Sequence, residues 1–269
     1  MRLTFRHIRV LSVLNYTHFK AIDMNNPFSL DNKKILVTGA SSGIGQCIAI
    51  ECSKMGAQMV VTARNQERLQ ETVSQLATTD SQEILADIST VEGVDAIVEN
   101  APALDGLVLN AGIIYTTPVK FINEENMMSV FNTNILSSIR LVQRLIKKKK
   151  LNRNASIVFI SSISTFQVKK GNSLYSATKG AVNSFAKALA AEVGHMGIRV
   201  NCIQPGNIKT RVMDSGAITE EQRAEYMKRY ILGEGEPLDV AYPAIYLLSN
   251  AAKWVTGSIF TIDGGGTLL

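Results

Sequence analysis

A glycine-rich turn near the start of the chain stands between an apolar strand and a helix. Residues 33–38 (KKILVT) predict a short buried strand, GASSGIG follows at 39–45, and residues 46–54 have a helical apolar pattern. Free N–H groups and the positive end of the helix dipole attract anions at such a junction. The glycine spacing alone would also fit a structural turn, but the flanking strand and helix favour a dinucleotide site.

The rest of the chain alternates between short strands and amphipathic helices. Further strands are expected at 58–62, 83–86, 106–109, 157–160, 198–203 and 258–262. Helices are expected at 65–76, 91–99, 176–194 and 237–249, with one helix or two over 124–150. This alternation predicts an α/β fold, a single-domain Rossmann-type doubly wound parallel sheet of about seven strands flanked by helices.

The end of the second strand bears on the choice of nicotinamide cofactor. NAD sites place an acidic residue there to hold the ribose 2′-hydroxyl, but this chain has Ala63 followed by Arg64. A guanidinium pairs well with a 2′-phosphate, although a solvated arginine at a helix start is the plain alternative. The sequence therefore favours NADP(H) and leaves NAD(H) open.

A second group of candidate functional side chains lies at 161–180 (SSISTFQVKKGNSLYSATKG). Tyr175 and Lys179 stand four residues apart on a predicted helix and so share one face, while Ser162 follows the apolar run 157–160. A free tyrosine has a pKa of about 10, and a neighbouring cation is expected to lower it, as general acid–base catalysis requires. Each residue alone has a plainer interpretation: the tyrosine would pack in the core, the serine would cap the next element, and the lysine would be solvated.

Composition limits the remaining possibilities. The net charge is +5, and the first 23 residues contribute four basic residues against one acidic residue, so the rest is nearly neutral and nucleic-acid binding is not predicted. Three cysteines without a C-x-x-C pair suggest reduced thiols and a cytoplasmic protein. No apolar run reaches the roughly 18 residues of a membrane span, and no metal site is predicted. We expect a tail at 1–27, with residues 1–23 dispensable, and one domain at 28–269.

Two further segments attract attention. Asn132 and Asn134 lie within the apolar helical region 124–150, where an asparagine side chain competes with backbone hydrogen bonds. Residues 207–232 carry no strong regular pattern before Thr219 and are expected to form a lid that sets substrate selectivity.

Taken together, the motifs resemble the short-chain dehydrogenase/reductase family over about residues 33–265. In order, the matching segments are TGASSGIG at 38–45, Asp87, NAG at 110–112, Asn134, Ser162, YSATK at 175–179, PG at 205–206 and DGG at 263–265. Among its members, the chain looks most like 3-oxoacyl-(acyl-carrier-protein) reductases.

The resemblance implies roles for individual residues. Tyr175 would be the catalytic acid/base, Lys179 its electrostatic partner and a ribose ligand, and Ser162 the hydroxyl that holds the substrate oxygen. Asn134, which the interval to Ser162 favours over Asn132, would anchor a water of the proton relay. The cofactor would be held by Gly39, Ser41, Ser42, Gly43, Ile44, Gly45, Arg64, Asp87, Ile88, Asn110, Ala111, Gly112, Tyr175, Lys179, Pro205, Gly206, Ile208 and Thr210.

The implied activity is the interconversion of a ketone and a secondary alcohol, with a small carbonyl or alcohol substrate, possibly an acyl-carrier-protein thioester. A sugar or polyol dehydrogenase of the same family and a non-catalytic nucleotide sensor remain alternatives. The resemblance also implies a homotetramer or homodimer built through helices 124–150 and 176–194. Two departures are noted: Leu109 stands where many members have asparagine, and Ser42 where NADP-dependent members often have arginine.

Overall fold

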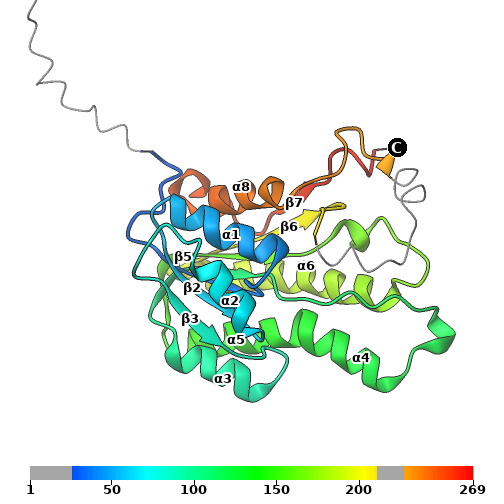
Figure 1. The fold of residues 1–269 in the computed structure, drawn as a ribbon, viewed down its shortest axis with the longest axis horizontal. Coiled ribbons are helices and arrows are strands. Elements are labelled where there is room, and N and C mark those ends of the chain that lie inside the picture. Colours follow the sequence, from blue (N-terminus) through cyan, green and yellow to red (C-terminus); the bar gives the residue numbers. More distant parts are fainter. Residues whose placement is uncertain (1–25, 211–226, 269) are drawn as a thin grey trace, which may run out of the picture.

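The computed structural model describes residues 26–210 and 227–268. Within them, seven strands form one sheet in the order β3-β2-β1-β4-β5-β6-β7, and every neighbouring pair is parallel (Figure 1). This confirms the predicted doubly wound sheet. The strands are β1 (Lys34–Thr38), β2 (Gln58–Ala63), β3 (Gln82–Leu85), β4 (Leu104–Leu109), β5 (Leu151–Ile160), β6 (Arg199–Pro205) and β7 (Ile259–Ile262).

Helices cover both faces of the sheet, as the crossovers of a parallel sheet require. One buried cluster joins the sheet to α1, α2 and α8, and a second joins it to α3, α5 and α6. Strand residues alternate between the two: Ile35 and Val37 face the first cluster and Leu36 the second. The helices are α1 (Gly43–Lys54), α2 (Gln66–Val73), α3 (Val91–Asn100), α4 (Glu124–Phe131), α5 (Ser137–Lys147), α6 (Ser173–Val193) and α8 (Pro237–Leu248).

The structure refines several predicted boundaries. The 124–150 region is two α-helices, α4 and α5, joined by a π-helical turn over Asn132–Leu136. Helix α6 begins at Ser173, so Tyr175 already lies in its first turn. Strand β5 begins at Leu151, with a register shift against β4 that the apolar pattern did not reveal. Residues 211–226 of the expected lid lie outside the described residues.

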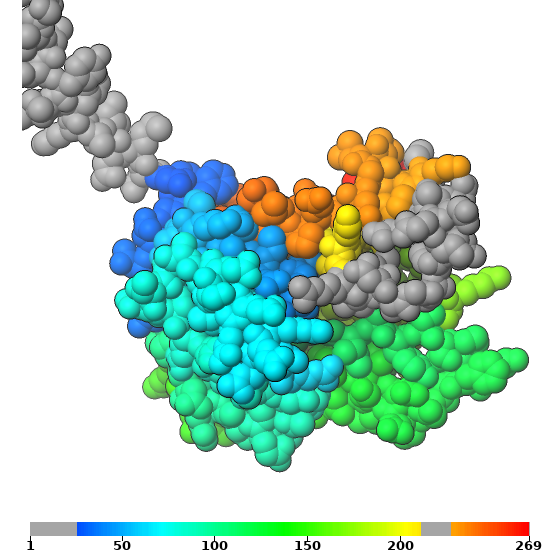
Figure 2. Space-filling view, viewed as in Figure 1, coloured from blue at the N-terminus to red at the C-terminus, as the bar shows by residue number. Residues whose placement is uncertain are grey.

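The sheet topology creates a crevice at one edge. The chain runs outward from β1 through β2 to β3, and then returns to place β4 on the other side of β1. Parallel sheets bind ligands where the strand order reverses in this way, at the carboxyl ends of the strands. In the space-filling view, the segment after β6 (yellow) lies beside residues of the first βα unit (blue) at this edge (Figure 2).

Candidate active site

A cleft of about 780 Å³ opens at the carboxyl edge of the sheet. It has the size typical of sites for small molecules and cofactors. All the residues predicted for catalysis or cofactor binding line it, except Gly45 and Asn134, which lie directly behind its wall. The cleft is thus continuous from the glycine-rich turn to Ser162, Tyr175 and Lys179.

The glycine-rich turn is packed against the end of β4. The Asn110 amide donates to the carbonyls of Thr38 and Gly39, at 3.1 Å each. Gly39 has a φ of 66°, a backbone conformation that favours glycine. A Cβ on Gly45 would collide with the Asn110 amide and the Gly39 carbonyl. Glycine is therefore required here so that the loop can close onto β4 and leave room for a phosphate-sized group at the α1 N-terminus.

The end of β2 presents two arginines to the cleft. Arg64 and Arg68 both line it, and the Asn65 side chain between them caps α2 by accepting from the Arg68 N–H at 2.9 Å. Arg68 was not among the residues predicted from the sequence; it lies in the first turn of α2, after the cap residue that follows Arg64. Among the described residues that line the cleft, Asp87 is the single acidic one.

Asp87 lies after β3, the strand that pairs with β2, and also lines this cleft. Burial acts to raise its pKa, but the hydroxyl and N–H of Ser89 donate to Oδ1 at 2.7 and 2.9 Å, and Arg64 adds a positive charge nearby. Together these contacts hold the pKa of Asp87 below its usual value. The carboxylate is therefore a fixed acceptor, suited to the amino group of an adenine.

Ser162 and Tyr175 bring two hydroxyls together at the other end of the cleft. Ser162 follows the end of β5 and caps a short 3₁₀ turn, and its Oγ accepts from the Ser164 N–H at 3.2 Å. Tyr175 is half-buried in the first turn of α6. Burial raises the pKa of Tyr175, and a hydrogen bond with Ser162 acts in the opposite direction without cancelling the effect. The phenol is therefore protonated at neutral pH.

Lys179 lies one helical turn beyond Tyr175 and is buried. Its Nζ donates to the Ile160 carbonyl at 2.8 Å and lies 5.7 Å from the centre of the Tyr175 ring. Burial lowers the pKa of Lys179 to about 8. The spacing argument is confirmed, but the expected lowering of the Tyr175 pKa is wrong: desolvation of the phenol dominates, and the ammonium is directed to β5.

Asn134 occupies the π-helical turn between α4 and α5 and is buried behind the cleft. Its Oδ1 accepts from the Ile113 N–H at 2.8 Å, and its Nδ2 donates to the Ile113 carbonyl at 2.9 Å and to Thr178 at 3.1 Å. A Cβ on Gly112 would lie 3.3 Å from this Oδ1 and 3.6 Å from Lys179 Nζ. Asn134 therefore ties the end of β4 to α6 and holds the cleft wall in place.

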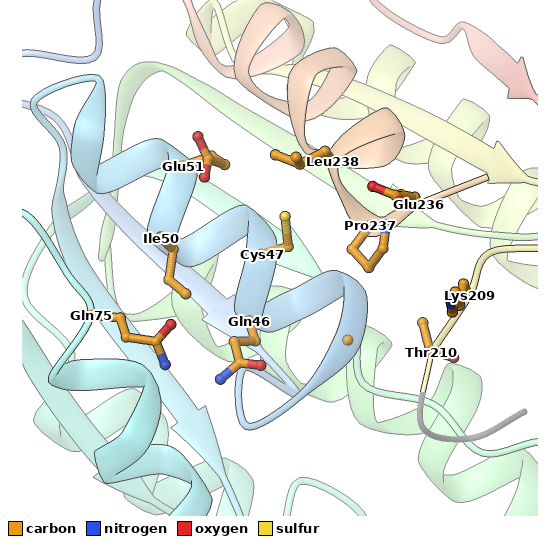
Figure 3. Close-up of a pocket in the computed structure, with 11 residues that line it drawn as sticks. Gln46, Cys47, Ile50, Glu51, Gln75, Lys209, Thr210, Glu236, Pro237 and Leu238 are labelled. Carbon is orange, nitrogen blue, oxygen red and sulfur yellow. The ribbon is translucent and has the colours of Figure 1, made fainter. Parts of the chain in front are cut away.

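A second, shallower cleft of about 360 Å³ lies behind the glycine-rich turn, between α1, the start of α8 and residues 209–210 (Figure 3). Cys47 lies on the α1 side of this cleft (Figure 3). Burial, with the charge of Glu51, raises the pKa of this thiol to about 11, so it stays protonated at neutral pH. None of the residues with a predicted catalytic role lines this cleft, and we assign the chemistry to the larger one.

Within residues 26–210 and 227–268, no group of three histidine, cysteine, aspartate or glutamate side chains is placed to hold a metal ion. Nor does this part of the chain contain a helix that is both long and apolar enough to cross a bilayer.

Comparison with known proteins agrees with this geometry. The profile of the family described as Enoyl-(Acyl carrier protein) reductase matches residues 39–267. The 3-oxoacyl-(acyl-carrier-protein) reductase of Chlamydia trachomatis is 34% identical over 244 residues, which cover 88% of this chain and 98% of the relative. The corresponding reductase of Rickettsia felis is 34% identical over 237 residues, with 88% and 97% covered.

Solved structures show the same fold. A proposed 2-deoxy-D-gluconate 3-dehydrogenase from Agrobacterium tumefaciens with bound NADP is 32% identical, with a TM-score of 0.82 over 91% of this chain and 100% of that one. A proposed gluconate 5-dehydrogenase from Beutenbergia cavernae with bound NADP is 30% identical, with a TM-score of 0.82 over 90% and 100%. By sequence, fold and the arrangement of its cleft, the chain belongs to the short-chain dehydrogenase/reductase family.

Proposed function

We propose that this oxidoreductase interconverts a ketone and a secondary alcohol with NADP(H). The observation that carries the proposal is the pair of hydroxyls, Ser162 and Tyr175, that line the same cleft, which continues to the glycine-rich turn. When bound, the nicotinamide supplies or accepts the hydride. The residues of the chain hold the carbonyl and move the proton.

In the direction of reduction, Tyr175 donates its proton to the oxygen of the substrate as negative charge develops there. Its raised pKa keeps that proton available at neutral pH. Ser162 donates a hydrogen bond to the same oxygen and stabilises the charge. Lys179, with a pKa of about 8, is mostly charged at neutral pH and stabilises the phenolate that remains. In oxidation, the same groups act in reverse order.

Asn134 is proposed as a positioning residue and as the anchor of a water in the proton relay. Its side-chain amide links Ile113, which lines the cleft, to Thr178 on α6. Loss of this amide would let the end of β4 move relative to α6, and with it the alignment of Lys179 and Tyr175. A catalytic site depends on such alignment within about 1 Å.

The cofactor proposal rests on the residues that surround the two ends of a dinucleotide. The glycine-rich turn fits a pyrophosphate, Asp87 an adenine, and residues 110–112 and Lys179 the riboses. Arg64 and Arg68, with no acidic residue at the end of β2, fit a 2′-phosphate. Both solved structures described above were determined with NADP.

The names of the relatives indicate two candidate classes of substrate. The curated relatives reduce 3-oxoacyl-(acyl-carrier-protein), whereas the solved structures are named for gluconate and deoxygluconate. A panel of 3-oxoacyl thioesters, enoyl thioesters and keto sugar acids, measured with NADPH and NADH, separates them. Absence of turnover with every substrate, despite tight NADPH binding, would favour the nucleotide-sensing alternative.

The functional unit and its assembly are also proposals. The Pro27 carbonyl accepts from the Ala251 N–H at 2.9 Å, so the chain already contacts the domain just before residue 28. We expect deletion of 1–23 to leave a soluble, active enzyme.

A homotetramer or homodimer through α4, α5 and α6 is consistent with the exposed apolar side chains of Phe121 and Met128, and light scattering of the purified protein tests it. Three free cysteines fit a reducing, cytoplasmic location.

A further inference from the structure

We propose that Gln167 determines specificity: its side-chain oxygen accepts a hydrogen bond from a donor on the substrate, a hydroxyl or an amide N–H. The inference rests on the proposed function, because it describes the ketone on which Ser162 and Tyr175 act. Gln167 lines the same cleft as these two residues.

The backbone of Gln167 is fixed relative to Ser162. Its N–H donates to the Ile163 carbonyl at 2.8 Å, across the 3₁₀ turn that Ser162 caps. Gln204 on β6 holds the same turn, because its Nε2 donates to the Ser162 carbonyl at 3.2 Å and to the Thr165 hydroxyl at 2.6 Å. Gln167 is therefore presented to the cleft from a turn that also carries one of the two reacting hydroxyls.

The neighbour of the Gln167 amide fixes which end is the donor. Nε2 lies 2.8 Å from the carbonyl oxygen of Gly266, which can only accept a hydrogen bond. Gly266 belongs to the turn at 263–267, where the Asp263 carboxylate accepts from the N–H and the hydroxyl of Thr267 at 2.9 and 2.6 Å. The amide nitrogen thus faces this turn, and Oε1 is left as an acceptor at the other end.

Gly266 cannot move away from the amide. A Cβ on Gly266 would collide with the ring of Tyr230, and a Cβ on Gly206 would lie 3.1 Å from the same ring. Tyr230 is buried and also lines the cleft. Because Gly266 is packed between the ring and the amide, the hydrogen bond to Nε2 is retained and the amide does not turn over.

The Oε1 atom of Gln167 is buried and finds no donor among the residues that the structure describes. A buried acceptor without a donor is costly, so a ligand that supplies one gains affinity. The side chain as a whole is half-buried and borders the cleft. Since the last torsion of a glutamine is soft, a small rotation turns Oε1 toward a donor in the cleft.

The test uses two pairs of ketones that differ in one kind of donor. 5-Keto-D-gluconate and 5-oxohexanoate share a carboxylate and the position of the ketone, and only the first carries hydroxyls. Acetoacetyl-N-acetylcysteamine carries an amide N–H, which an ester oxygen replaces in S-acetoacetyl-2-mercaptoethyl acetate. Within each pair, the ratio of kcat/KM values is compared between native enzyme and variants, which cancels the intrinsic reactivity of the ketones.

Three variants separate the possible roles of the amide. Gln167→Met removes both the acceptor and the bond to Gly266, whereas Gln167→Glu keeps an acceptor and loses only the N–H. The matched control is Gln82→Met, which changes an exposed glutamine on β3 whose Nε2 donates to the Asn100 carbonyl at 3.2 Å.

We expect the ratio of one pair to fall about tenfold in Gln167→Met, the scale of one hydrogen bond, through a higher KM for the ketone with the donor. The ratio in Gln167→Glu and Gln82→Met should stay within about threefold of the native value, and the Kd for NADPH within about twofold in all variants. The pair that responds identifies the donor. Unchanged ratios in Gln167→Met, equal losses for both members of each pair, or the same fall in Gln167→Glu would overturn the proposal.

Failure of the proposed function would look different, because then none of the four ketones would be reduced. In that case, titration calorimetry of the NADP⁺-loaded proteins compares D-gluconate with hexanoate, and N-acetylcysteamine with 2-mercaptoethyl acetate. Binding of a ligand with a donor that is about tenfold weaker in Gln167→Met, and unchanged in Gln167→Glu and Gln82→Met, supports the acceptor role. Equal affinities in native enzyme and Gln167→Met, or no binding, would reject it.

Discussion

The Lys179 ammonium lies 5.7 Å from the centre of the Tyr175 ring, one helical turn away, and it donates its 2.8 Å hydrogen bond to the carbonyl of Ile160. Strand β5 therefore holds the charge in place beneath the phenol. Because burial raises the pKa of Tyr175 and lowers that of Lys179, both groups keep their protons at neutral pH. This is the state that reduction of a carbonyl requires.

The buried charge of Lys179 makes stability depend on pH. Its pKa is about 8 in the fold and about 10.4 in an unfolded chain. Below about pH 8 both states are protonated and the cost of the buried charge is complete. Between these values the unfolded state binds more protons, so the free energy of unfolding rises with pH. The variant Lys179→Met lacks this component.

We therefore expect the unfolding free energy of the native protein, relative to Lys179→Met, to rise by about 2 kcal/mol between about pH 7.5 and pH 10. Urea denaturation of both proteins without nucleotide measures this difference. The comparison cancels titration of the other groups. A difference that stays constant over this range would show that Lys179 is not desolvated as the structure indicates.

The close contact of α1 with β4 predicts that Gly45 cannot be replaced. In Gly45→Ala the new Cβ collides with the Asn110 amide and the Gly39 carbonyl, so the loop must open. We expect a loss of about 1–3 kcal/mol in stability and at least a tenfold weaker Kd for NADPH. Gly194→Ala is the matched control: no atom lies within 4 Å of the added Cβ, and the backbone there is helical.

The control should retain NADPH affinity and gain up to about 1 kcal/mol in stability, because alanine favours helical backbone over glycine. Thermal denaturation and the change in NADPH fluorescence on binding measure both effects. Equal NADPH affinity in Gly45→Ala and Gly194→Ala would mean that the glycine-rich turn does not hold the cofactor.

The two arginines after β2 should determine the preference for NADPH. Arg64→Ala and Arg68→Ala should each weaken the Kd for NADPH about tenfold, the scale of one charge-assisted hydrogen bond, and leave the Kd for NADH unchanged. Arg153→Ala, an exposed arginine on β5 at the opposite edge, serves as control. Equal losses for NADPH and NADH would place the arginines outside the 2′-phosphate site.

Much of the fold could be read from the sequence because its signals are local. The buried strands are short apolar runs. A glycine-rich segment directly between such a run and a helical pattern predicts the tight turn that joins β1 to its helix. The shared face of Tyr175 and Lys179 follows from helical spacing alone. The placement of the predicted residues around one cleft then followed from the parallel sheet, which brings all strand ends to one edge.

Other features depend on contacts between distant segments. The π-helical turn at Asn134 is stabilised by hydrogen bonds to Ile113 and Thr178. The local sequence pattern does not predict these bonds. The start of β5 at Leu151 depends on its pairing with β4. The pKa of Tyr175 was predicted in the wrong direction because the sequence showed the neighbouring cation but not the desolvation of the phenol.

We propose that the Tyr175 hydroxyl transfers the proton while the rest of the cleft binds the cofactor. NADPH oxidation and NADPH affinity are therefore measured together in Tyr175→Phe, with a control variant, Tyr242→Phe, which changes an exposed tyrosine on α8. The substrate is the ketone that the native enzyme reduces fastest in the panel. We predict that Tyr175→Phe loses at least about 10²-fold in kcat, the scale of general acid catalysis, while its Kd for NADPH stays within about threefold. Native turnover in Tyr175→Phe would show that another group transfers the proton.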